Sequence, residues 1–297
     1  MIHVGILRYS NARYLWWAIA LTVSSLLLYS TQGDLQPQNG GTWQGYVLGT
    51  IGALLIVWLT FLGVRKRSYS SNLGTVQGWT SAHVYLGSVL LVVATLHSAG
   101  QLGWNVHSLA YVLMCLVIFS GFYGIYTYIN FPQEITANRS GSTRAGLFAE
   151  LFSLDNRGRQ VGAKGPDDIN VAVRSAIDRT AIGGSIYAQL LGKDQSRFIR
   201  PSGSGDSSAG KPVSNRDQQP VIDLIAERLP KTNKIAETES LQELLGIFCR
   251  RQAVLRRISR DIRLRGQIGV WLLIHIPISI ALIFALAIHI VTTFIYW

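Results

Sequence analysis

The sequence is poor in charged residues, which make up 14% of its 297 residues against about 25% in soluble globular proteins. Apolar residues reach 48% and gather in long runs, which excludes an ordinary soluble enzyme. Cysteine is equally scarce, because Cys115 and Cys249 are the only two and neither belongs to a CxxC or CxxCH motif. This scarcity excludes covalently attached c-type haem, iron–sulfur clusters and zinc fingers.

Five apolar segments are each long enough, at about 20 residues, to cross the hydrocarbon core of a membrane as a helix. We therefore expect an all-α integral membrane protein with five transmembrane helices and a polar, mostly helical insert before the fifth. The expected spans are 14–30, 45–63, 80–98, 106–129 and 268–295. The expected parts of the chain are residues 1–130 with four spans, the insert 131–267, and residues 268–297 with the fifth span.

Basic residues near the spans indicate their orientation. They precede the first span and follow the second, whereas the short loops 31–44 and 99–105 contain none. The positive-inside rule then places the N-terminus and the 131–267 insert in the cytoplasm. The first span lacks a clear cleavage site and is interpreted as a retained anchor, and nothing resembles a transit peptide, which favours a bacterial inner membrane. The basic residues concerned are Arg8, Arg13, Arg65, Lys66 and Arg67.

The insert carries most of the charge and has two notable segments. Residues 193–219 are rich in Ser, Gly, Asp, Lys and Pro, a composition that predicts a disordered linker. Residues 248–265 contain seven arginines and a single acidic residue, Asp261, and lead directly into the fifth span. We expect this basic stretch to contact anionic lipid at the cytoplasmic surface, at about 1 kcal/mol per basic residue. Nucleic-acid binding is not expected, because the stretch adjoins a span and lacks interleaved aromatic residues.

Four histidines within the apolar segments form the most informative pattern. His83 and His97 lie in the third span, and His275 and His289 lie in the fifth, so that both pairs are 14 positions apart. At a rise of about 1.5 Å per residue, the two rings of each span lie about 21 Å apart on one helix face. The third and fifth spans run in the same direction. His83 can therefore face His275, which we call the inner pair, and His97 can face His289, which we call the outer pair.

Two facing imidazoles supply both axial ligands of a six-coordinate haem iron, so the pattern predicts two stacked haem b groups. Histidine inside a membrane is costly and usually functional. The alternative, purely structural histidines, would have to explain two equal spacings on two parallel helices. A zinc site or a proton relay fits less well, because its ligands would converge at one depth, often with carboxylates. The five expected spans contain no Asp or Glu.

Glycines lie at depths that match the histidines. Gly49 and Gly52 in the second span are expected beside the outer pair, whereas Gly87 in the third and Gly121 in the fourth are expected beside the inner pair. Without side chains, these positions let a flat macrocycle approach the backbone. Close packing of helices through small residues is the alternative.

Three further residues lie near the expected ends of the haem sites. His107, at the outer end of the fourth span, is expected to be a solvated interfacial residue, with a contact to a haem propionate, a quinone or a redox partner as the alternative. Arg67 and Arg265 are alternatively placed to reach propionates of the inner haem.

An apolar WxxxHxPxS run surrounds the first histidine of the fifth span, at Trp271, His275, Pro277 and Ser279. With histidine pairs on two parallel helices, this run resembles the cytochrome b561 and ferric-reductase-like transmembrane group. The resemblance covers about residues 45–129 and 268–297 and implies that the four histidines ligate haem within a four-helix bundle of the second to fifth spans. The first span and the insert depart from the group's pattern. No flavin and nucleotide domain follows the bundle, so we expect the electron donor to be another protein or a quinol.

The pattern as a whole favours a b-type di-haem cytochrome that transfers electrons across a membrane between two bis-histidine haems. One alternative is the membrane subunit of a quinone oxidoreductase or a metal reductase. Another is a haem-free scaffold of a membrane complex. We expect the partners to be a redox protein or a quinone, and the chain to belong to a larger membrane complex.

Overall fold

The computed structural model describes residues 4–31, 40–68, 72–201 and 210–295. The chain is 81% helical, which confirms the expected all-α class. It divides into two compact units, one formed by Met1–Asn130 with Val270–Trp297 and the other by Phe131–Gly269.

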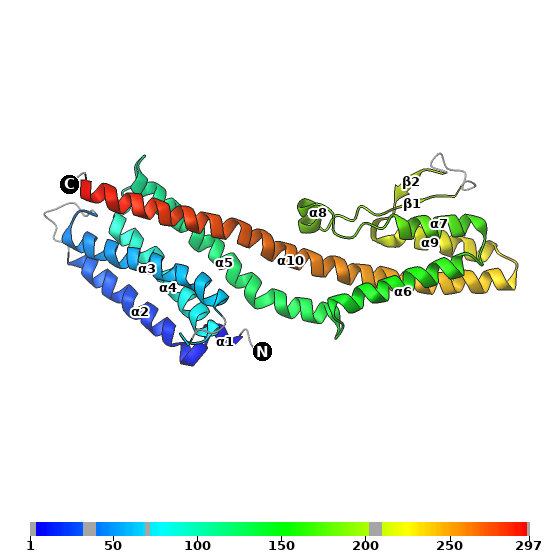
Figure 1. Ribbon diagram of the computed structural model, residues 1–297, viewed down its shortest axis with the longest axis horizontal. Helices are drawn as coiled ribbons and strands as arrows, with labels where there is room; N and C mark the ends of the chain where they lie inside the picture. The colour runs from blue at the N-terminus through cyan, green and yellow to red at the C-terminus, as the bar shows by residue number, and fades with distance from the viewer. Residues whose placement is uncertain (1–3, 32–39, 69–71, 202–209, 296–297) are drawn as a thin grey trace. The chain divides into compact units, whose positions relative to one another are not determined.

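Five helices in the described ranges are long and apolar enough to cross a membrane, as the sequence predicts (Figure 1). They are α2 (Tyr9–Ser30), α3 (Trp43–Arg67), α4 (Val76–Ser98), α5 (Val106–Arg139) and α10 (Ile235–Ile295), and the short α1 (Val4–Leu7) precedes them. α5 and α10 are longer than the expected spans 106–129 and 268–295. The apolar pattern ends at those limits, but both helices continue into polar sequence, and α5 does so through Pro132.

The ends of α3 and α4 are set by local capping. Thr42 and Thr75 accept hydrogen bonds from the backbone N–H groups of Gly45 and Gly78, each at 3.1 Å. α4 ends at Ala99, which has a positive φ of 47°. These caps place His97 in the last turn of α4, close to where the helix ends.

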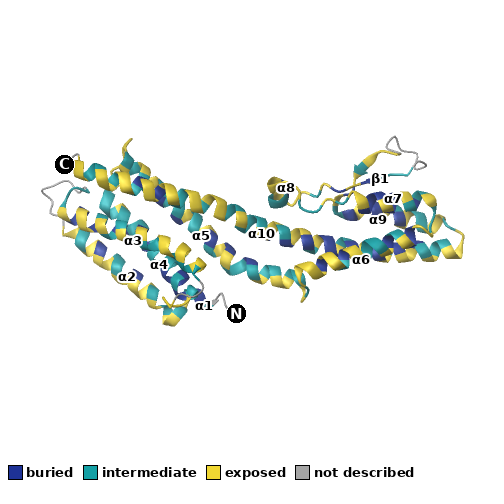
Figure 2. Ribbon diagram, viewed as in Figure 1, coloured by how far each residue is buried: buried dark blue, intermediate teal, exposed yellow. Residues whose placement is uncertain are grey.

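The first unit exposes large apolar residues, and Figure 2 shows exposed residues all along its helices. Trp17 on α2, Leu54 on α3 and Phe284 on α10 are 67%, 65% and 67% exposed. Such large apolar side chains on the outside suit a lipid environment. Inside, one cluster joins α2, α3 and α4 through Ala18, Leu48, Val89 and Val93.

The second unit is built mainly from short helices around the beginning of α10. Its apolar core includes Ile169, Phe198, Ile225, Leu244 and Phe248. Its elements are α6 (Arg144–Gly162), α7 (Asp167–Asp178), α8 (Ile186–Leu191), β1 (Arg197–Ile199), β2 (Pro212–Ser214), the 3₁₀ helix η1 (Arg216–Gln218), α9 (Gln219–Arg228) and the 3₁₀ helix η2 (Leu229–Lys231).

The described part of residues 193–219 differs from the disordered linker that its composition predicts. β1 and β2 form an antiparallel pair in which Phe198 lies opposite Val213. Phe198, Asn215 and Gln218 are buried, so one aromatic side chain and two amides tie the segment to the helical core. A composition rich in Ser, Gly and Pro does not reveal such isolated anchors. Residues 202–209 of the expected linker lie outside the described residues.

The arginines of the basic stretch 248–265 are mostly engaged within the second unit. Except for Asp261, which lies one helical turn before Arg265, their acidic partners lie on distant segments of sequence, so the sequence alone does not reveal those pairings. The ion pairs are Arg250–Glu150, Arg251–Asp155, Arg256–Asp217, Arg260–Glu134 and Arg265–Asp261. Much of the positive charge expected to face lipid is therefore neutralised by intramolecular carboxylates.

Candidate functional site

The outer pair of histidines comes together in the first unit. The ring centres of His97 on α4 and His289 on α10 lie 6.0 Å apart, with their planes at 79°. Two imidazoles that ligate one metal ion from opposite sides have ring centres about 6 Å apart, since each metal–nitrogen bond is about 2 Å long and each ring centre lies about 1 Å beyond its nitrogen. The observed separation agrees with that requirement.

The two histidines of α4 are held by backbone carbonyls of α3. His83 Nδ1 lies 3.1 Å from the carbonyl oxygen of Leu59, and His97 Nδ1 lies 2.8 Å from that of Gly45. A carbonyl only accepts, so both Nδ1 atoms carry the proton and donate it. Leu59 and Gly45 are themselves fourteen positions apart, and α3 runs antiparallel to α4. The same spacing therefore supplies an acceptor at each of the two depths.

His275 is held by α5 in an equivalent way. Ser120 Oγ donates to the carbonyl of Val117 at 2.8 Å, so it accepts from His275 Nδ1 at 2.7 Å. Trp271, one turn earlier on α10, donates its indole N–H to the Ser120 carbonyl at 2.8 Å and stacks obliquely on His275, with ring centres 5.3 Å apart. A Cβ at Gly124 would overlap the Trp271 indole, so this glycine is what lets the indole reach α5. Trp271 and His275 of the WxxxHxPxS run thus dock as one unit on α5.

His289 has a different partner from the other three. Its Nδ1 lies 2.5 Å from Nδ1 of His107, at the start of α5, and the two ring centres are 4.5 Å apart. His107 is exposed, as the sequence predicts, but it also contacts one of the four patterned histidines. Its position one residue into the helix after a loop gave no sign of this contact.

The inner pair is linked by electrostatic interactions. The imidazoles of His83 and His275 interact electrostatically, and Lys66 near the end of α3 interacts with both rings. The Lys66 ammonium also lies 5.5 Å from the centre of the Tyr128 ring. The sequence marks Lys66 only as a topology signal, whereas the fold brings its charge to the inner pair.

The chemistry of these donor sets fits a metal with two axial imidazole ligands. Nδ1 hydrogen bonds of this kind orient a ligating histidine and leave the Nε2 lone pair available. Across the described ranges, the hydrogen bonds of all four rings run through Nδ1, and no three His, Cys, Asp or Glu side chains converge as a metal site. Zinc requires about four protein ligands, whereas a porphyrin supplies four of the six that haem iron needs.

A buried apolar layer separates the two pairs. Leu90 is seven positions from both histidines of α4, and Leu282 is seven positions from both histidines of α10. Both leucines are buried in one cluster to which α3 and α5 also contribute. The buried members of this cluster are Ile56, Leu90, Met114, Ile118 and Leu282. The layer keeps water and charge away from the space between the two pairs.

The four glycines predicted to flank the haems have different surroundings. A Cβ at Gly49 would lie 2.7 Å from His97 Cε1, so this glycine accommodates the histidine ring itself. Gly52 faces Leu90 and Val93 at ordinary packing distances of 3.9 Å, which is helix packing. Gly121 lies against His275, whose Cε1 would be 3.9 Å from a Cβ, and Gly87 faces Leu59 Cδ1 at 4.0 Å. Only Gly49 and Gly121 are thus in contact with the patterned histidines.

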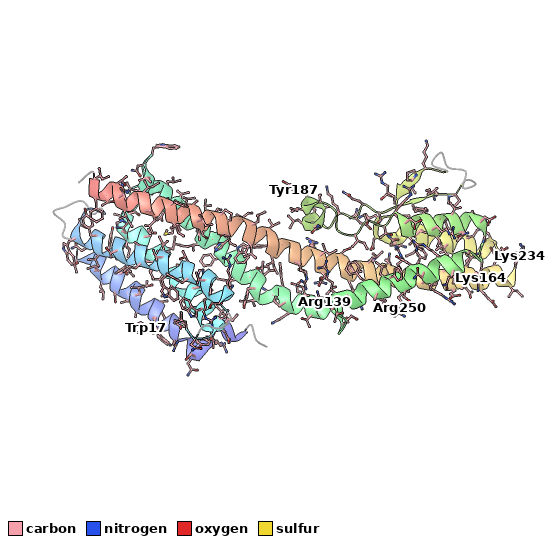
Figure 3. The ribbon with its side chains drawn as sticks, viewed as in Figure 1. Trp17, Arg139, Lys164, Tyr187, Lys234 and Arg250 are labelled. Atoms are coloured by element: carbon pink, nitrogen blue, oxygen red, sulfur yellow. The ribbon has the colours of Figure 1, made fainter. Side chains whose placement is uncertain are left out.

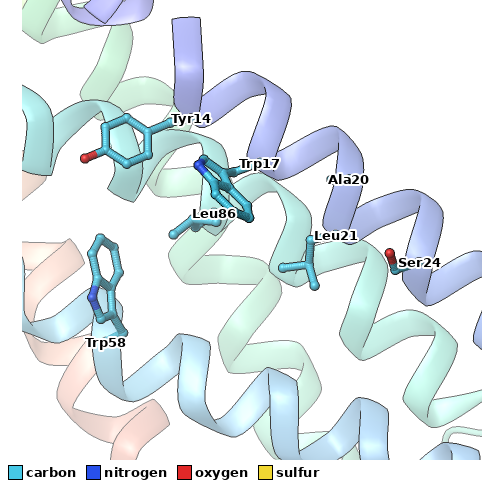
Figure 4. Close-up of a pocket in the computed structure, with 7 residues that line it drawn as sticks. All are labelled: Tyr14, Trp17, Ala20, Leu21, Ser24, Trp58 and Leu86. Atoms are coloured by element: carbon cyan, nitrogen blue, oxygen red, sulfur yellow. The ribbon is translucent and has the colours of Figure 1, made fainter. Parts of the chain in front are cut away.

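A separate groove lies between α2, α3 and α4 within the same unit (Figure 4). Trp17 from α2, Trp58 from α3 and Leu86 from α4 line it, and Tyr14 and Ser24 add hydroxyl groups. Leu86 is one turn from His83, and Trp58 precedes the residue whose carbonyl accepts the His83 hydrogen bond. The groove therefore lies on the elements that hold the inner pair.

No protein-family model matches the sequence, and comparisons with curated proteins and with solved structures also returned no match. The site is therefore interpreted from the chemistry of this chain alone.

Proposed function

We propose that the chain is a b-type di-haem cytochrome that transfers electrons across a membrane, similar to the cytochrome b561 and ferric-reductase-like transmembrane group. One observation carries the proposal. The rings of His97 and His289 lie 6.0 Å apart, and at two depths of the bundle three of the four patterned rings have Nδ1 within 3.1 Å of an oxygen acceptor. The equal spacing of the histidines predicts only that the rings face each other. The Nδ1 hydrogen bonds add the support that a histidine ligating through Nε2 typically has.

In this proposal, each histidine pair would hold one haem. His83 with His275 would ligate the inner haem, and His97 with His289 would ligate the outer one. Haem, when bound, supplies an iron that changes by one electron between its ferric and ferrous states. The acceptors on α3 and α5 fix the tautomer and ring direction of their histidines and increase their basicity.

The surroundings of each pair would tune its redox behaviour. The apolar layer around Leu90 and Leu282 keeps the interior dry, so charges near the irons are weakly screened. The positive charge of Lys66 near the inner pair favours the reduced state there, because it disfavours a further positive charge on the iron. The two haems are therefore proposed to differ in potential.

The proposal includes the orientation and partners that the sequence predicts. The basic ends of α2 and α3 support a bacterial inner membrane with the 131–267 insert in the cytoplasm. The insert would dock a soluble redox partner or other subunits of a membrane complex, and a quinone is the alternative partner within the bilayer.

Single-ligand variants test the assignment of the pairs. His97→Ala is expected to lose the outer haem and retain the inner one, so the haem content falls by about half, and His83→Ala is expected to do the opposite. Haem content per chain and the redox titration of each variant are the measurements. If His97→Ala kept both haems with unchanged potentials, the proposed pairing would be refuted.

A quinone oxidoreductase subunit is the second function that a specific observation favours. The groove of Figure 4 is apolar, lies on membrane-spanning helices and offers two indoles to a flat ring. Trp17→Ala is expected to slow haem reduction by a short-chain quinol, whereas Phe284→Ala, which changes an exposed residue of α10 outside the groove, is not. Equal rates in the two variants would remove this function from consideration.

A further inference from the structure

The short helix α8 (Ile186–Leu191) presents an apolar face outward from the second unit. Ile186, Tyr187 and Leu191 are 58%, 79% and 61% exposed, whereas Ala188 is 4% exposed and faces the interior. Tyr187 and Leu191 are four positions apart and share one face of the helix. Figure 3 labels Tyr187 on this helix. A soluble surface seldom concentrates large apolar side chains on a single turn and a half of helix.

The contacts of α8 place it next to the membrane-proximal end of the second unit. Gln189 Cβ lies 3.9 Å from where a Cβ of Gly266 would be. Arg263 Nη1 lies 3.6 Å from where a Cβ of Gly192, the residue that caps the end of α8, would be. Gly266 is two residues before the apolar stretch 268–295 of α10, a rise of about 3 Å. The residue of α10 that α8 contacts therefore lies within about one helical turn of the point where α10 becomes apolar enough to cross a membrane.

The charges around α8 match the surface of a membrane. Arg263 on α10 and Lys193 after α8 are both exposed, and within the described part of the chain neither forms an ion pair. By contrast, five other arginines of residues 248–265 are paired with carboxylates. Arg257 of the same stretch also forms none of these ion pairs, but Arg263 and Lys193 are the available cations next to the exposed apolar face.

We propose that α8 is an interfacial anchor, whose Ile186, Tyr187 and Leu191 insert at the boundary between headgroups and acyl chains of the membrane that α10 spans. Tyrosine favours this boundary because its ring is apolar and its hydroxyl is polar. Arg263 and Lys193 contact anionic headgroups beside it. The proposal moves the expected lipid contact from the whole basic stretch 248–265 to α8 and its two flanking cations. It needs membrane insertion of α10 and is independent of haem.

Spin labels on single cysteines test the proposal in the full chain. Cys115→Ala and Cys249→Ser remove the native thiols, and Tyr187→Cys or Leu191→Cys then carries the label in nanodiscs that contain phosphatidylglycerol. Lys164→Cys, exposed after α6, is the matched control. The labels at 187 and 191 are expected to collide severalfold more often with oxygen, relative to a water-soluble nickel chelate, than the label at 164.

Two outcomes would overturn the anchor. One is a ratio of oxygen to nickel collisions at 187 and 191 equal to that at 164. The other is shielding from nickel at 187 that persists in lipid-free amphipol, which would indicate a protein neighbour. A fall in the ratio when phosphatidylglycerol is replaced by a neutral lipid would support the contacts of Arg263 and Lys193.

Discussion

Each of the four patterned imidazoles has its Nδ1 within hydrogen-bond distance of a partner, yet the partners are chemically different. Leu59 and Gly45 offer backbone carbonyls and Ser120 offers a hydroxyl, all of which stay neutral. His289 alone pairs with another imidazole, that of His107. For His289 to ligate through Nε2, its Nδ1 must donate the proton to His107. At the scale of single residues, the outer pair therefore differs from the inner pair in its side-chain support.

His107→Ala is expected to raise the potential of the outer haem by about 40 mV, which corresponds to the loss of a hydrogen bond worth about 1 kcal/mol. The reason is that donation from Nδ1 makes the ligand more basic and favours the ferric state. Ser120→Ala is the matched variant and is expected to shift only the inner haem in the same direction. Redox titration with optical detection measures both. The prediction fails if one variant shifts the potentials of both haems, or if the two variants shift the potential of the same haem.

At the scale of elements, the two glycines Gly49 and Gly52 on α3 have different roles. Gly49 leaves room for the His97 ring, whereas Gly52 packs against ordinary apolar side chains of α4. The sequence predicts a glycine face at this depth, but spacing alone does not distinguish a residue that admits a ligand from one that admits a helix.

Gly49→Ala is expected to displace the His97 ring, because the new Cβ would lie 2.7 Å from its Cε1. The outer haem should then be lost or bound at reduced occupancy. Gly52→Ala, whose Cβ would meet neighbours at 3.9 Å, should keep both haems and serves as the control. Haem per chain in the two purified variants decides the matter, and equal content would contradict the role given to Gly49.

The five membrane-spanning helices and the equal histidine spacing can be read from the sequence, because hydropathy and helical periodicity are local properties. The atoms that support the four histidines cannot be predicted from the sequence in this way. The carbonyls of Leu59 and Gly45 have no side-chain signature, and Ser120, Lys66 and His107 reach the histidines only through packing of separate helices. The same limit hides the acidic partners of the basic stretch, such as Asp217 for Arg256.

At the scale of the whole molecule, the two units have different sources of stability. The first unit exposes apolar side chains and depends on the bilayer, whereas the second has an apolar core of its own around Ile225 and Phe248. Arg251 lies fully buried in the second unit and donates to Asp155, Gln218 and Thr180 at 2.6, 2.5 and 2.7 Å. Removing it takes one donor from each of these three polar groups, of which Gln218 keeps the hydrogen bond from Asn215.

Arg251→Ala is expected to destabilise the second unit by about 3–5 kcal/mol, as the loss of one partner of a buried ion pair does. Arg250→Ala removes a largely exposed pair with Glu150 and should cost less than about 1 kcal/mol. Amide hydrogen exchange in α6, α7 and α9 of the full chain measures both effects, and haem content should stay constant in each. Equal exchange in the two variants would show that the buried network is not what stabilises this unit.

The central claim is that the two histidine pairs hold haem. Its most direct test is the dithionite-reduced minus oxidised absorption spectrum of the purified full chain, with haem extracted and counted per polypeptide. The account predicts a b-type spectrum and two haems per chain. Folded protein that binds no haem would contradict it, and would leave the facing histidines as polar contacts between the helices of a membrane scaffold.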